Sequence, residues 1–588
     1  MNKEVLAVAK GTRPADLVVS NGKIVNVYSG EIYDGGVAVC GNTIAAVGDV
    51  DYCIGAQTKV IDAQGHYITP GFLDGHIHPE SSSLAIRPFA EAVLSHGTTG
   101  IMTDLHEIGV VSGLPGIEAV LKEAEATDLK IYFVVPSHVP FAPDLETSGG
   151  HFNPAIIREA LQRPDAVGLS ECVGPYILDE HPELMESFDD TLAMGGKTLQ
   201  GHLPDLDAHG ISACAAAGVT TCHESFCEED VFKRLRNGIH LQMREGSAAR
   251  NMSVLLKTVM DNHLDTSMVS IVTDDLHTID LQTQGHLDAS LRTALATGLD
   301  FTTAIQMVTV NCAKAFNLDR EIGALAPGRR ADINITTGPE DFHVLSTIAG
   351  GRHVAENGNM LVHYPQAVHD PCLLNTMHLL HPITPESFQI HVSPEVKKVK
   401  ALVMDTLPFI PFTQRRDVEL KVVDGVVQCD PDQDVLYIAQ VERHGVNGNI
   451  GKAFMGGFHL RGGALASSVG HDNHNIIVMG DNFEDMAMAV NRCMEMGGGQ
   501  LIVRHGKVAA QVAYPICGLM SDLSLDELAE QKKALNQVAY DMGTPIAIPF
   551  MFLCFICLAC IEAYAITDHG FIDVHAQKII NPILEILE

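Results

Sequence analysis

The stretch Gly71-Phe72-Leu73-Asp74-Gly75-His76-Ile77-His78 decides how the rest of this chain is interpreted. Read as a strand, it places His76 and His78 on one face, because side chains alternate across a strand. Two imidazoles that converge from a strand end supply half of a metal site, although a short His-X-His motif alone is weak evidence. Later strand-like segments strengthen the interpretation, because they too end in metal-binding residue types.

Outward from this stretch, strand-like and helix-compatible segments alternate. Eight such units predict a closed parallel barrel of the TIM type, a (β/α)8 barrel, with its functional groups at the carboxyl ends of the strands. The strand-like segments are residues 72–78, 98–104, 130–137, 166–171, 197–202, 219–224, 240–245 and 268–275. The helix-compatible segments include residues 114–126, 154–162, 206–217, 228–237 and 287–297.

The segments on both sides of the barrel have a different pattern. Between residues 17 and 60, short β-branched runs alternate with turn residues, which predicts a meander of antiparallel strands. Short strands return after residue 323, so we expect the barrel to be inserted in a small β-sandwich domain of an α/β chain. The expected boundaries are residues 1–69 and 321–380 for the small β domain, 70–320 for the barrel, and 381–588 for a C-terminal α+β domain.

The balance of charged residues restricts the kinds of molecule that the chain is expected to bind. The 588 residues include 38 Lys and Arg against 73 Asp and Glu, which gives a net charge of −35. This charge disfavours binding to nucleic acid or to an anionic membrane, and it favours a small neutral or cationic substrate. Residues 1–13 contain no apolar run typical of a secretory signal. We therefore expect a cytoplasmic protein that binds a small molecule, and we expect a homodimer.

Most of the 14 cysteines are single residues in apolar runs, as expected of buried, reduced thiols. One group, Cys554, Cys557 and Cys560, has the spacing of a soft-metal or cluster site. It lies in the almost wholly apolar segment 550–561 and lacks a clear fourth ligand. We therefore favour core packing over a metal site for these three residues.

Four further residues at strand ends extend the metal hypothesis. Glu171 can bridge two divalent ions, His202 and His223 can complete the shell of the second ion, and Asp274 can bind metal while accepting a proton. Each has a plain structural alternative when taken singly: a core histidine, a charge at a helix N-terminus or a helix cap. These single-residue alternatives do not account for the occurrence of all four residues in this order.

This set of residue types suits hydrolysis at neutral pH. Two ions that share one water lower its pKa, which makes hydroxide available, and they also polarise the electrophile. A carboxylate that takes the proton of the water can deliver it to a leaving amine. Imidazole and carboxylate ligands suit Mn, Fe or Zn.

Three motifs together resemble the amidohydrolase superfamily, whose members have a TIM-like barrel in a small β sandwich and a one- or two-metal centre. They are Pro70 to His78, the series Glu171, His202, His223 and Asp274, and Gly328-Arg329-Arg330-Ala331-Asp332. More narrowly, the chain resembles the adenine deaminase family within it. The motifs for this narrower resemblance are His78-Pro79-Glu80-Ser81-Ser82, Thr103-Asp104-Leu105-His106-Glu107-Ile108, Glu146-Thr147-Ser148-Gly149, Thr273-Asp274-Asp275-Leu276-His277 and the extra C-terminal domain.

The resemblance implies a hydrolase that removes the amino group at C6 of adenine and releases hypoxanthine and ammonia, a reaction of purine salvage. It implies two divalent ions per chain, with Mn or Fe favoured over Zn. It also implies catalytic roles for Asp274, as proton shuttle, and for Glu171. The implied metal ligands are His76, His78, Glu171, His202, His223 and Asp274.

Two segments depart from the family pattern. His138, in Val135-Pro136-Ser137-His138-Val139-Pro140, stands where a cysteine is expected, and residues 172–176 also differ. Both lie beside the expected pocket, so they put the details of substrate binding in doubt and leave the metal ligands untouched.

Several weaker candidates accompany the metal ligands. His106 and Glu107 either contact the substrate or cap a helix, whereas Asp275 and His277 either orient the purine or, as we favour, support the metal-binding aspartate. A dense polar run in the C-terminal domain can close over the barrel mouth or bind a further ion, although a surface turn is the favoured alternative. The candidates in this run are His471, Asp472 and His474.

A different hydrolase remains the main alternative. An enzyme that opens a cyclic amide or cleaves an N-acyl group would use the same two ions. Many such relatives bridge their ions with a carbamylated lysine from the fourth strand, and this chain has Glu171 there instead. A non-catalytic scaffold would be expected to lack ligands, and a metal-storage protein would be expected to gather its 29 histidines in tracts.

Overall fold

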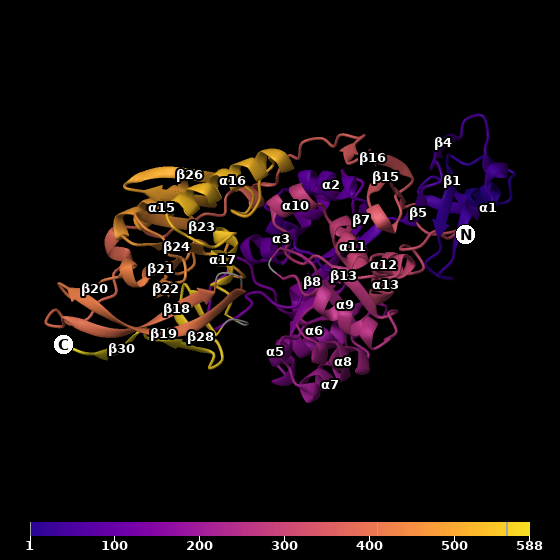
Figure 1. Cartoon of the computed structure of the whole chain (residues 1–588). Coiled ribbons are helices and arrows are strands. Elements are labelled where there is room, and N and C mark those ends of the chain that lie inside the picture. The colour runs from indigo at the N-terminus through magenta and orange to yellow at the C-terminus, as the bar shows by residue number, and fades with distance from the viewer. Residues whose placement is uncertain (1, 248, 408–409, 560–562) are drawn as a thin grey trace.

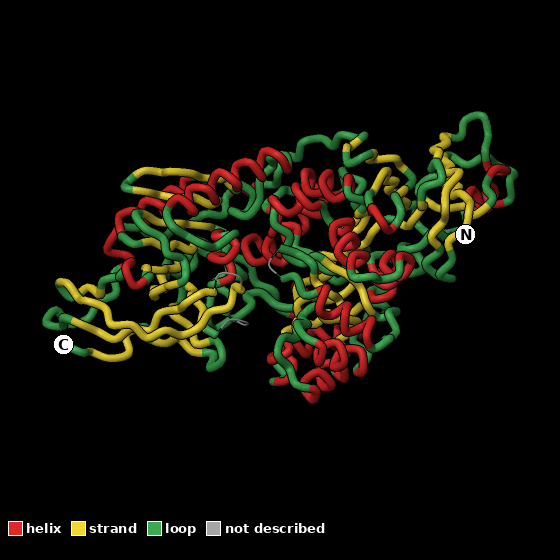
Figure 2. The backbone as a smooth tube through the Cα atoms, in the orientation of Figure 1, coloured by secondary structure: helices red, strands yellow, loops and turns green. Residues whose placement is uncertain are grey.

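The computed structural model describes residues 2–247, 249–407, 410–559 and 563–588. Figure 1 shows three parts in a row, with the barrel between a small β region near the N-terminus and the C-terminal domain. The barrel strands lie within a layer of helices (Figure 2). Within the described residues, no helix is both long enough and apolar enough to span a membrane.

Eight parallel strands form the barrel, as the alternating pattern predicts. They follow one another in chain order, and a bridge between Ile77 and Asp274 joins the last strand to the first. Their apolar residues are buried on both faces, as is usual in parallel sheets. The strands are β6 (Phe72–Asp74), β7 (Thr98–Thr103), β8 (Lys130–Pro136), β9 (Ala166–Val173), β10 (Thr198–His202), β11 (Val219–Cys222), β12 (His240–Arg244) and β13 (Val269–Val272).

The first strand is shorter than predicted, because β6 ends at Asp74 and does not extend to His78. The buried carboxylate of Asp74 accepts hydrogen bonds from the backbone of His76 and from the backbone and hydroxyl of Thr273. Such side-chain bonds to nearby backbone compete with a strand ladder. The two histidines therefore lie just beyond the strand.

Helices cover the outside of the barrel. Helix α3 consists of two helical segments that meet at Gly113, whose φ of 64° is not helical, so the predicted helix at residues 114–126 corresponds to the second segment and the first was not predicted. The helices are α2 (Ile86–Ser95), α3 (His106–Ala124), α4 (Pro154–Ala160), α5 (Gly174–Leu178), α6 (Pro182–Ala193), α7 (Ala208–Ala216), α8 (Glu228–Arg236), α9 (Met252–Asp261), α10 (Thr278–Gln284), α11 (Leu287–Ala296), α12 (Phe301–Met307) and α13 (Val310–Ala315).

One nine-stranded sheet combines segments that precede and follow the barrel. Its strands are β1 (Leu17–Val25), β2 (Ile32–Cys40), β3 (Thr43–Gly48), β4 (Lys59–Asp62), β5 (Tyr67–Pro70), β14 (Ile333–Thr336), β15 (Val344–Ala349), β16 (Arg352–Glu356) and β17 (Asn359–Met360). Strand β5 pairs with β14, so the sheet holds the two ends of the barrel together. The N-terminal segment is not a purely antiparallel meander, because β1 pairs in parallel with β4 and β5. Helix α1 (Lys3–Ala9) precedes it.

The C-terminal domain is built on a ten-stranded sheet and a separate three-stranded sheet. The larger sheet contains β18 (Lys398–Leu407), β19 (Ile410–Val423), β20 (Val426–Val427), β21 (Leu436–Val441), β22 (Ile450–Gly456), β23 (Gly463–Ser467), β24 (Ile476–Gly480), β25 (Gly499–Arg504), β26 (Lys507–Ala513) and β30 (Ile583–Ile586). The smaller sheet contains β27 (Tyr564–Thr567), β28 (Gly570–Asp573) and β29 (Lys578–Ile580). Helix α14 (Pro371–Leu374) precedes the domain, whose own helices are α15 (Phe483–Glu495), α16 (Leu525–Asp541) and α17 (Pro549–Phe555).

Candidate active site

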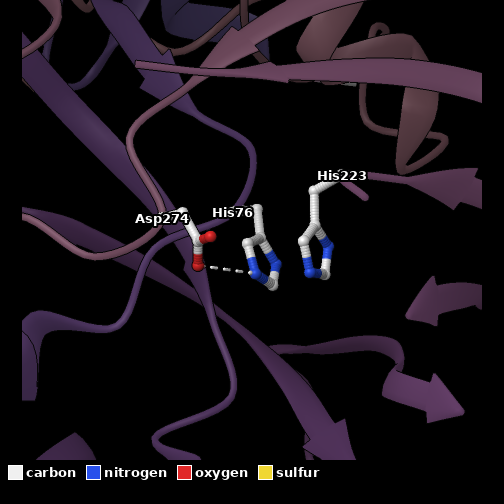
Figure 3. A group of neighbouring side chains, drawn as sticks. All are labelled: His76, His223 and Asp274. Carbon is white, nitrogen blue, oxygen red and sulfur yellow. Dashed lines mark ion pairs between the residues drawn. The ribbon is translucent and has the colours of Figure 1, made fainter. Parts of the chain in front are cut away.

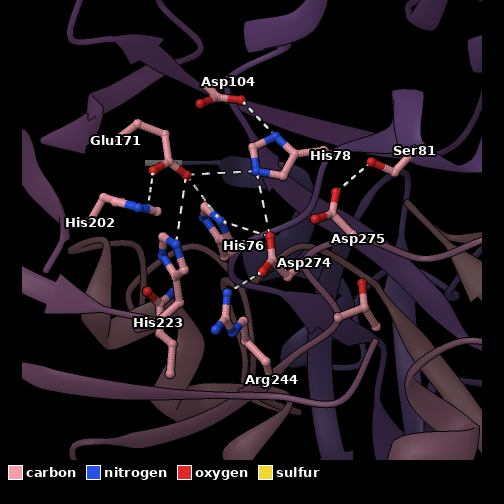
Figure 4. A network of polar contacts seen from close by, with 12 residues as sticks. His76, His78, Ser81, Asp104, Glu171, His202, His223, Arg244, Asp274 and Asp275 are labelled. Carbon is pink, nitrogen blue, oxygen red and sulfur yellow. Dashed lines mark hydrogen bonds and ion pairs between the residues drawn. The ribbon is translucent and has the colours of Figure 1, made fainter. Parts of the chain in front are cut away.

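Six side chains of metal-binding type converge at the carboxyl ends of the barrel strands. Figure 4 shows them pointing toward one another. Five are buried and one, His78, is half-buried. They are His76 and His78 after β6, Glu171 in β9, His202 at the end of β10, His223 after β11 and Asp274 after β13.

The backbone turns both carboxylates into this centre. Glu171 has a φ of 53° and Asp274 a φ of 60°, both in the left-handed region that residues other than glycine rarely adopt. Strain of this kind persists where the surrounding structure holds it, and it occurs often at functional sites. A strand ending in a carboxylate is visible in the sequence, but this local turn is not.

Glu171 lies at the middle of the cluster. Its Oε1 lies 3.3 Å from His76 Nε2, 3.6 Å from His78 Nε2 and 3.8 Å from His223 Nε2. Its Oε2 lies 2.9 Å from His202 Nδ1. One carboxylate therefore faces all four imidazoles, which is the position that a bridging ligand would need.

Asp274 approaches the same centre from the opposite side. Its Oδ1 lies 3.4 Å from His76 Nε2 and 3.5 Å from His78 Nε2. The ring of His76 stacks on that of His223, with centroids 3.8 Å apart, and Figure 3 shows His76 between His223 and Asp274. Asp274 therefore shares two histidines with Glu171.

These residues fit divalent metal. Three overlapping groups have ligand atoms within 4.8 Å of one another, and all six side chains belong to at least one of them. Within the described residues, His76 Nε2 and His202 Nε2 are buried without a hydrogen-bond partner. Unpartnered buried polar atoms are costly, and a bound cation would satisfy them. Imidazole and carboxylate ligands suit divalent first-row ions.

Arg244 and Glu224 are part of the site, although they were not among the predicted residues. Arg244 Nη1 donates to Asp274 Oδ2 at 2.9 Å, and both its terminal nitrogens donate to Glu224, at 2.6 and 2.9 Å. All three side chains are buried. Their positions in the sequence could have identified them, because each lies at the end of a predicted barrel strand.

The ionisation of the carboxylates follows from these partners. Burial opposes ionisation of Glu171, but His223 and His202 hold the pKa of its carboxyl well below the ordinary value. Burial also opposes ionisation of Asp274, and the contacts with His76 and Arg244 again lower its pKa. The pKa of Glu224 falls to about 2 because the charge of Arg244 outweighs burial. All three carboxylates are therefore anionic at neutral pH.

A second set of polar residues surrounds the centre. His78 Nδ1 lies 3.3 Å from Asp104 Oδ1, which can orient the ring. Ser81 donates to Asp275 Oδ1 at 2.5 Å and to Glu107 Oε1 at 3.3 Å. These contacts link the segment after His78 to two of the weaker candidates.

Of the four weaker candidates from the barrel, three line the cavity and one caps a helix. His106, Glu107 and Asp275 line the same cavity as the metal-binding cluster. His277 does not line it, and its Nδ1 accepts a hydrogen bond from the backbone of Ile279 at the start of α10. His277 therefore caps a helix.

The polar run of the C-terminal domain reaches the barrel mouth. His471 and Asp472 line the cavity, together with Phe555 and Leu558. His474 is fully buried behind them, with its Nε2 3.7 Å from Glu107 Oε2. Its Nδ1 accepts from Gly470 N. Glu107, His471 and His474 have ligand atoms within 4.8 Å of one another, and among the described residues His474 Nε2 and Glu107 Oε2 are buried without a hydrogen-bond partner, so the further ion stays a prediction.

The two segments that depart from the family pattern lie beside the cavity. His138 stacks on Phe141, with centroids 5.1 Å apart, and its ring edge faces Tyr176. Phe141 lines the cavity and contacts His202 edge-on. Their influence on the substrate would therefore pass through the ring of Phe141.

Of the three clustered cysteines, Cys554 and Cys557 are buried free thiols in an apolar core. Cys560 lies outside the described residues. The two described thiols therefore show the packing expected for core residues.

A parallel barrel whose strand ends gather four imidazoles and two carboxylates defines a metal-dependent hydrolase of the amidohydrolase class. Residues 67–354 match the model of the amidohydrolase family, and residues 411–578 match the adenine deaminase C-terminal domain. Two curated proteins named adenine deaminase are similar over the whole length. The one from Clostridium botulinum (strain Langeland) is 39% identical over 100% of this chain and 98% of its own. The one from Moorella thermoacetica is 38% identical over 99% and 98%.

The chain belongs to the adenine deaminase family of amidohydrolases, as its motifs predicted. A solved structure described as an adenine deaminase is 17% identical, with a TM-score of 0.44 over 58% of this chain and 100% of that chain. The predicted α/β class with a TIM-like barrel and an additional C-terminal domain is confirmed. Divalent metal is the class of cofactor that the family and the residues support.

Proposed function

We propose that this chain catalyses the hydrolytic deamination of adenine to hypoxanthine and ammonia. The observation that supports this substrate is the similarity to proteins named adenine deaminase over the full chain, including both the barrel and the C-terminal domain. The site supports the reaction type, because it combines a metal-binding cluster with an anionic carboxylate in position to move a proton.

We assign two ions to the cluster. His76, His78 and Asp274 would hold the first, His202 and His223 the second, and Glu171 would bridge them. Mn or Fe is favoured and Zn is the alternative. When bound, such ions lower the pKa of a water molecule and polarise the carbon that it attacks.

Asp274 carries the proton in this mechanism. Its Oδ1 faces His76 and His78, where it would hold the first ion, and its Oδ2 accepts from Arg244. The Asp274 carboxylate takes the proton of the attacking water and then gives it to the departing amino group, which leaves as ammonia. Glu171 contributes by holding four imidazoles around one point.

Arg244 acts as a positioning residue for Asp274. Its guanidinium is fixed by the two hydrogen bonds that it donates to the Glu224 carboxylate, and a third donated bond fixes Asp274. A planar guanidinium held in this bidentate manner has little freedom to rotate. The shuttle carboxylate is therefore oriented before the substrate arrives.

The test is ammonia release from adenine by protein loaded with Mn or Fe, with Zn as a third preparation. Adenosine and a cyclic amide serve as control substrates. Activity on adenine that Asp274→Asn abolishes is the expected result. Turnover of the cyclic amide without turnover of adenine would reject the deaminase and leave the alternative hydrolase.

The oligomeric state and the location of the protein are also proposals. We propose a cytoplasmic homodimer, with the domain boundaries given above. Light scattering coupled to gel filtration would give the mass of the particle against the 63.3 kDa of one chain. A monomer would reject the dimer without affecting the proposed reaction.

A further inference from the structure

The C-terminal domain forms one wall of the cavity. His471, Asp472, Phe555 and Leu558 line it from that domain, and the barrel supplies the other lining residues. Figure 1 shows α17, which ends at Phe555, on the side of the C-terminal domain that faces the barrel. A substrate bound at the metal cluster would therefore share the cavity with this wall.

Asp472 offers an acceptor to this cavity. It is a mostly buried residue whose Oδ1 lies 3.2 Å from His471 Nδ1. Its Oδ2 has no hydrogen bond from any of the described residues. A carboxylate oxygen that faces a cavity in a buried site gains most from an N–H donor on the ligand.

Phe555 and Leu558 give the wall an apolar surface. The ring of Phe555 stacks on that of His471, with centroids 5.0 Å apart and planes at 26°. Together with Phe141, they are the only side chains without polar atoms among the described residues that line the cavity. The other lining side chains all carry ionisable groups, so the contacts available to the flat faces of an aromatic ring are concentrated here.

The chemistry of a purine determines what this wall can recognise. When C6 lies at the metal cluster, the imidazole ring of the purine points away from the cluster. The free base carries one N–H on that ring. A purine substituted at N9 lacks this donor and carries a bulky group in its place.

We propose that the C-terminal domain recognises the imidazole edge of the free base, with Asp472 accepting its N–H and with Phe555 and Leu558 against the ring. This inference rests on the proposed function. It assigns to the C-terminal domain the selection of unsubstituted bases over N9-substituted purines such as nucleosides. A site built to bond an N–H rejects the analogue that lacks it by about 10⁴-fold.

The test compares adenine with 9-methyladenine in the metal-loaded enzyme and in Asp472→Asn. We expect the wild type to prefer adenine in kcat/KM, and the variant to lose about 10- to 100-fold of that preference, because it removes one charge-assisted hydrogen bond. The loss should appear in KM for adenine, with kcat less affected. Calorimetric titration of hypoxanthine and 9-methylhypoxanthine should show the same change in the ratio of affinities.

Two further variants locate the effect. Asp275→Asn removes a carboxylate that lines the same cavity from the barrel, and we expect the preference for the free base to remain. Phe555→Ala should weaken hypoxanthine binding about 10-fold or more, because an aromatic contact is lost, whereas Phe552→Ala, from the same helix but outside the cavity, should not.

The outcomes separate this inference from the proposed function. If the wild type releases no ammonia from adenine, the proposed function fails. If it does, but Asp472→Asn keeps the full preference for the free base, or Asp275→Asn removes it, the assignment to the C-terminal domain is overturned. Equal effects of Phe555→Ala and Phe552→Ala would reject the role of the ring.

Discussion

His369 connects the barrel to the C-terminal domain through both nitrogens of one ring. Its Nδ1 lies 3.0 Å from Glu123 Oε1 on α3, and its Nε2 lies 2.5 Å from Asp522 Oδ2. A neutral imidazole has only one N–H, so both carboxylates are satisfied only by the imidazolium. The hydrogen bonds that His369 donates to Asp522 and Glu123 accordingly raise its pKa to about 10.

We expect His369→Gln to lower the free energy of unfolding by about 2–4 kcal/mol near pH 6. Two charge-assisted hydrogen bonds contribute about 1.5–3 kcal/mol each, and the amide of glutamine can replace one of them with a neutral bond. Partial solvent contact reduces the total, since the side chain is 11% exposed.

The stability difference between wild type and His369→Gln should decrease as the pH rises. The pKa of His369 is higher in the folded state than the ordinary value of 6.5. The stabilisation is therefore complete below about pH 6.5 and is lost as the pH rises through about 10. Wild type and variant should converge above that pH.

Thermal unfolding followed by far-UV circular dichroism provides the assay, because the chain has no Trp for fluorescence. At about 2–4 °C per kcal/mol, the variant should unfold roughly 4–16 °C lower at pH 6 and at nearly the wild-type temperature at pH 10.5. His343→Gln is the control, because His343 pairs with Asp341 on the surface with 54% of its side chain exposed. A deficit that is absent at pH 6, or equal at both pH values, would refute the reasoning.

Three more predictions concern the site and its support. Glu171→Gln should lose at least half of the bound metal, measured by mass spectrometry of the loaded protein, because the bridging oxygens face all four imidazoles; full retention would exclude bridging. Arg244→Met should lower kcat for adenine about 10- to 100-fold by releasing Asp274, and an unchanged kcat in a folded variant would remove Arg244 from the mechanism. Lys532 is fully buried with one bond to Ser83 Oγ at 2.9 Å, and burial lowers its pKa to about 7. Lys532→Met should therefore raise the unfolding temperature at pH 7, where charging this amine favours the unfolded state, and the gain should fade toward pH 10.5; a loss at pH 7 would contradict this.

The barrel could be predicted from the sequence because its signal is local and repeated. Each unit combines a short apolar run with a helix-compatible segment, and parallel strands must be buried on both faces. The end of β6 could not be predicted in this way. It depends on hydrogen bonds between Asp74 and Thr273, residues that are far apart in the sequence.

The convergence of the six predicted ligands could be predicted because they stand at strand ends, and a parallel barrel brings all its strand ends to one face. Arg244 and Glu224 had the same signal, but only the structure shows their pairing. The positions of Phe555 and Leu558 in the sequence did not indicate a role in the site, since an apolar residue in an apolar run gives no sign of a nearby cavity. Their role depends on how two distant parts of the chain pack together.

The wall formed by the C-terminal domain also sets an order of events during synthesis. All six residues assigned to the metal ions precede Phe555 and Leu558 by most of the C-terminal domain. Domains fold largely in the order in which they are made. A growing chain therefore has its metal-binding barrel before the wall exists, so ions can enter through an open mouth that is narrowed only when the last helix docks.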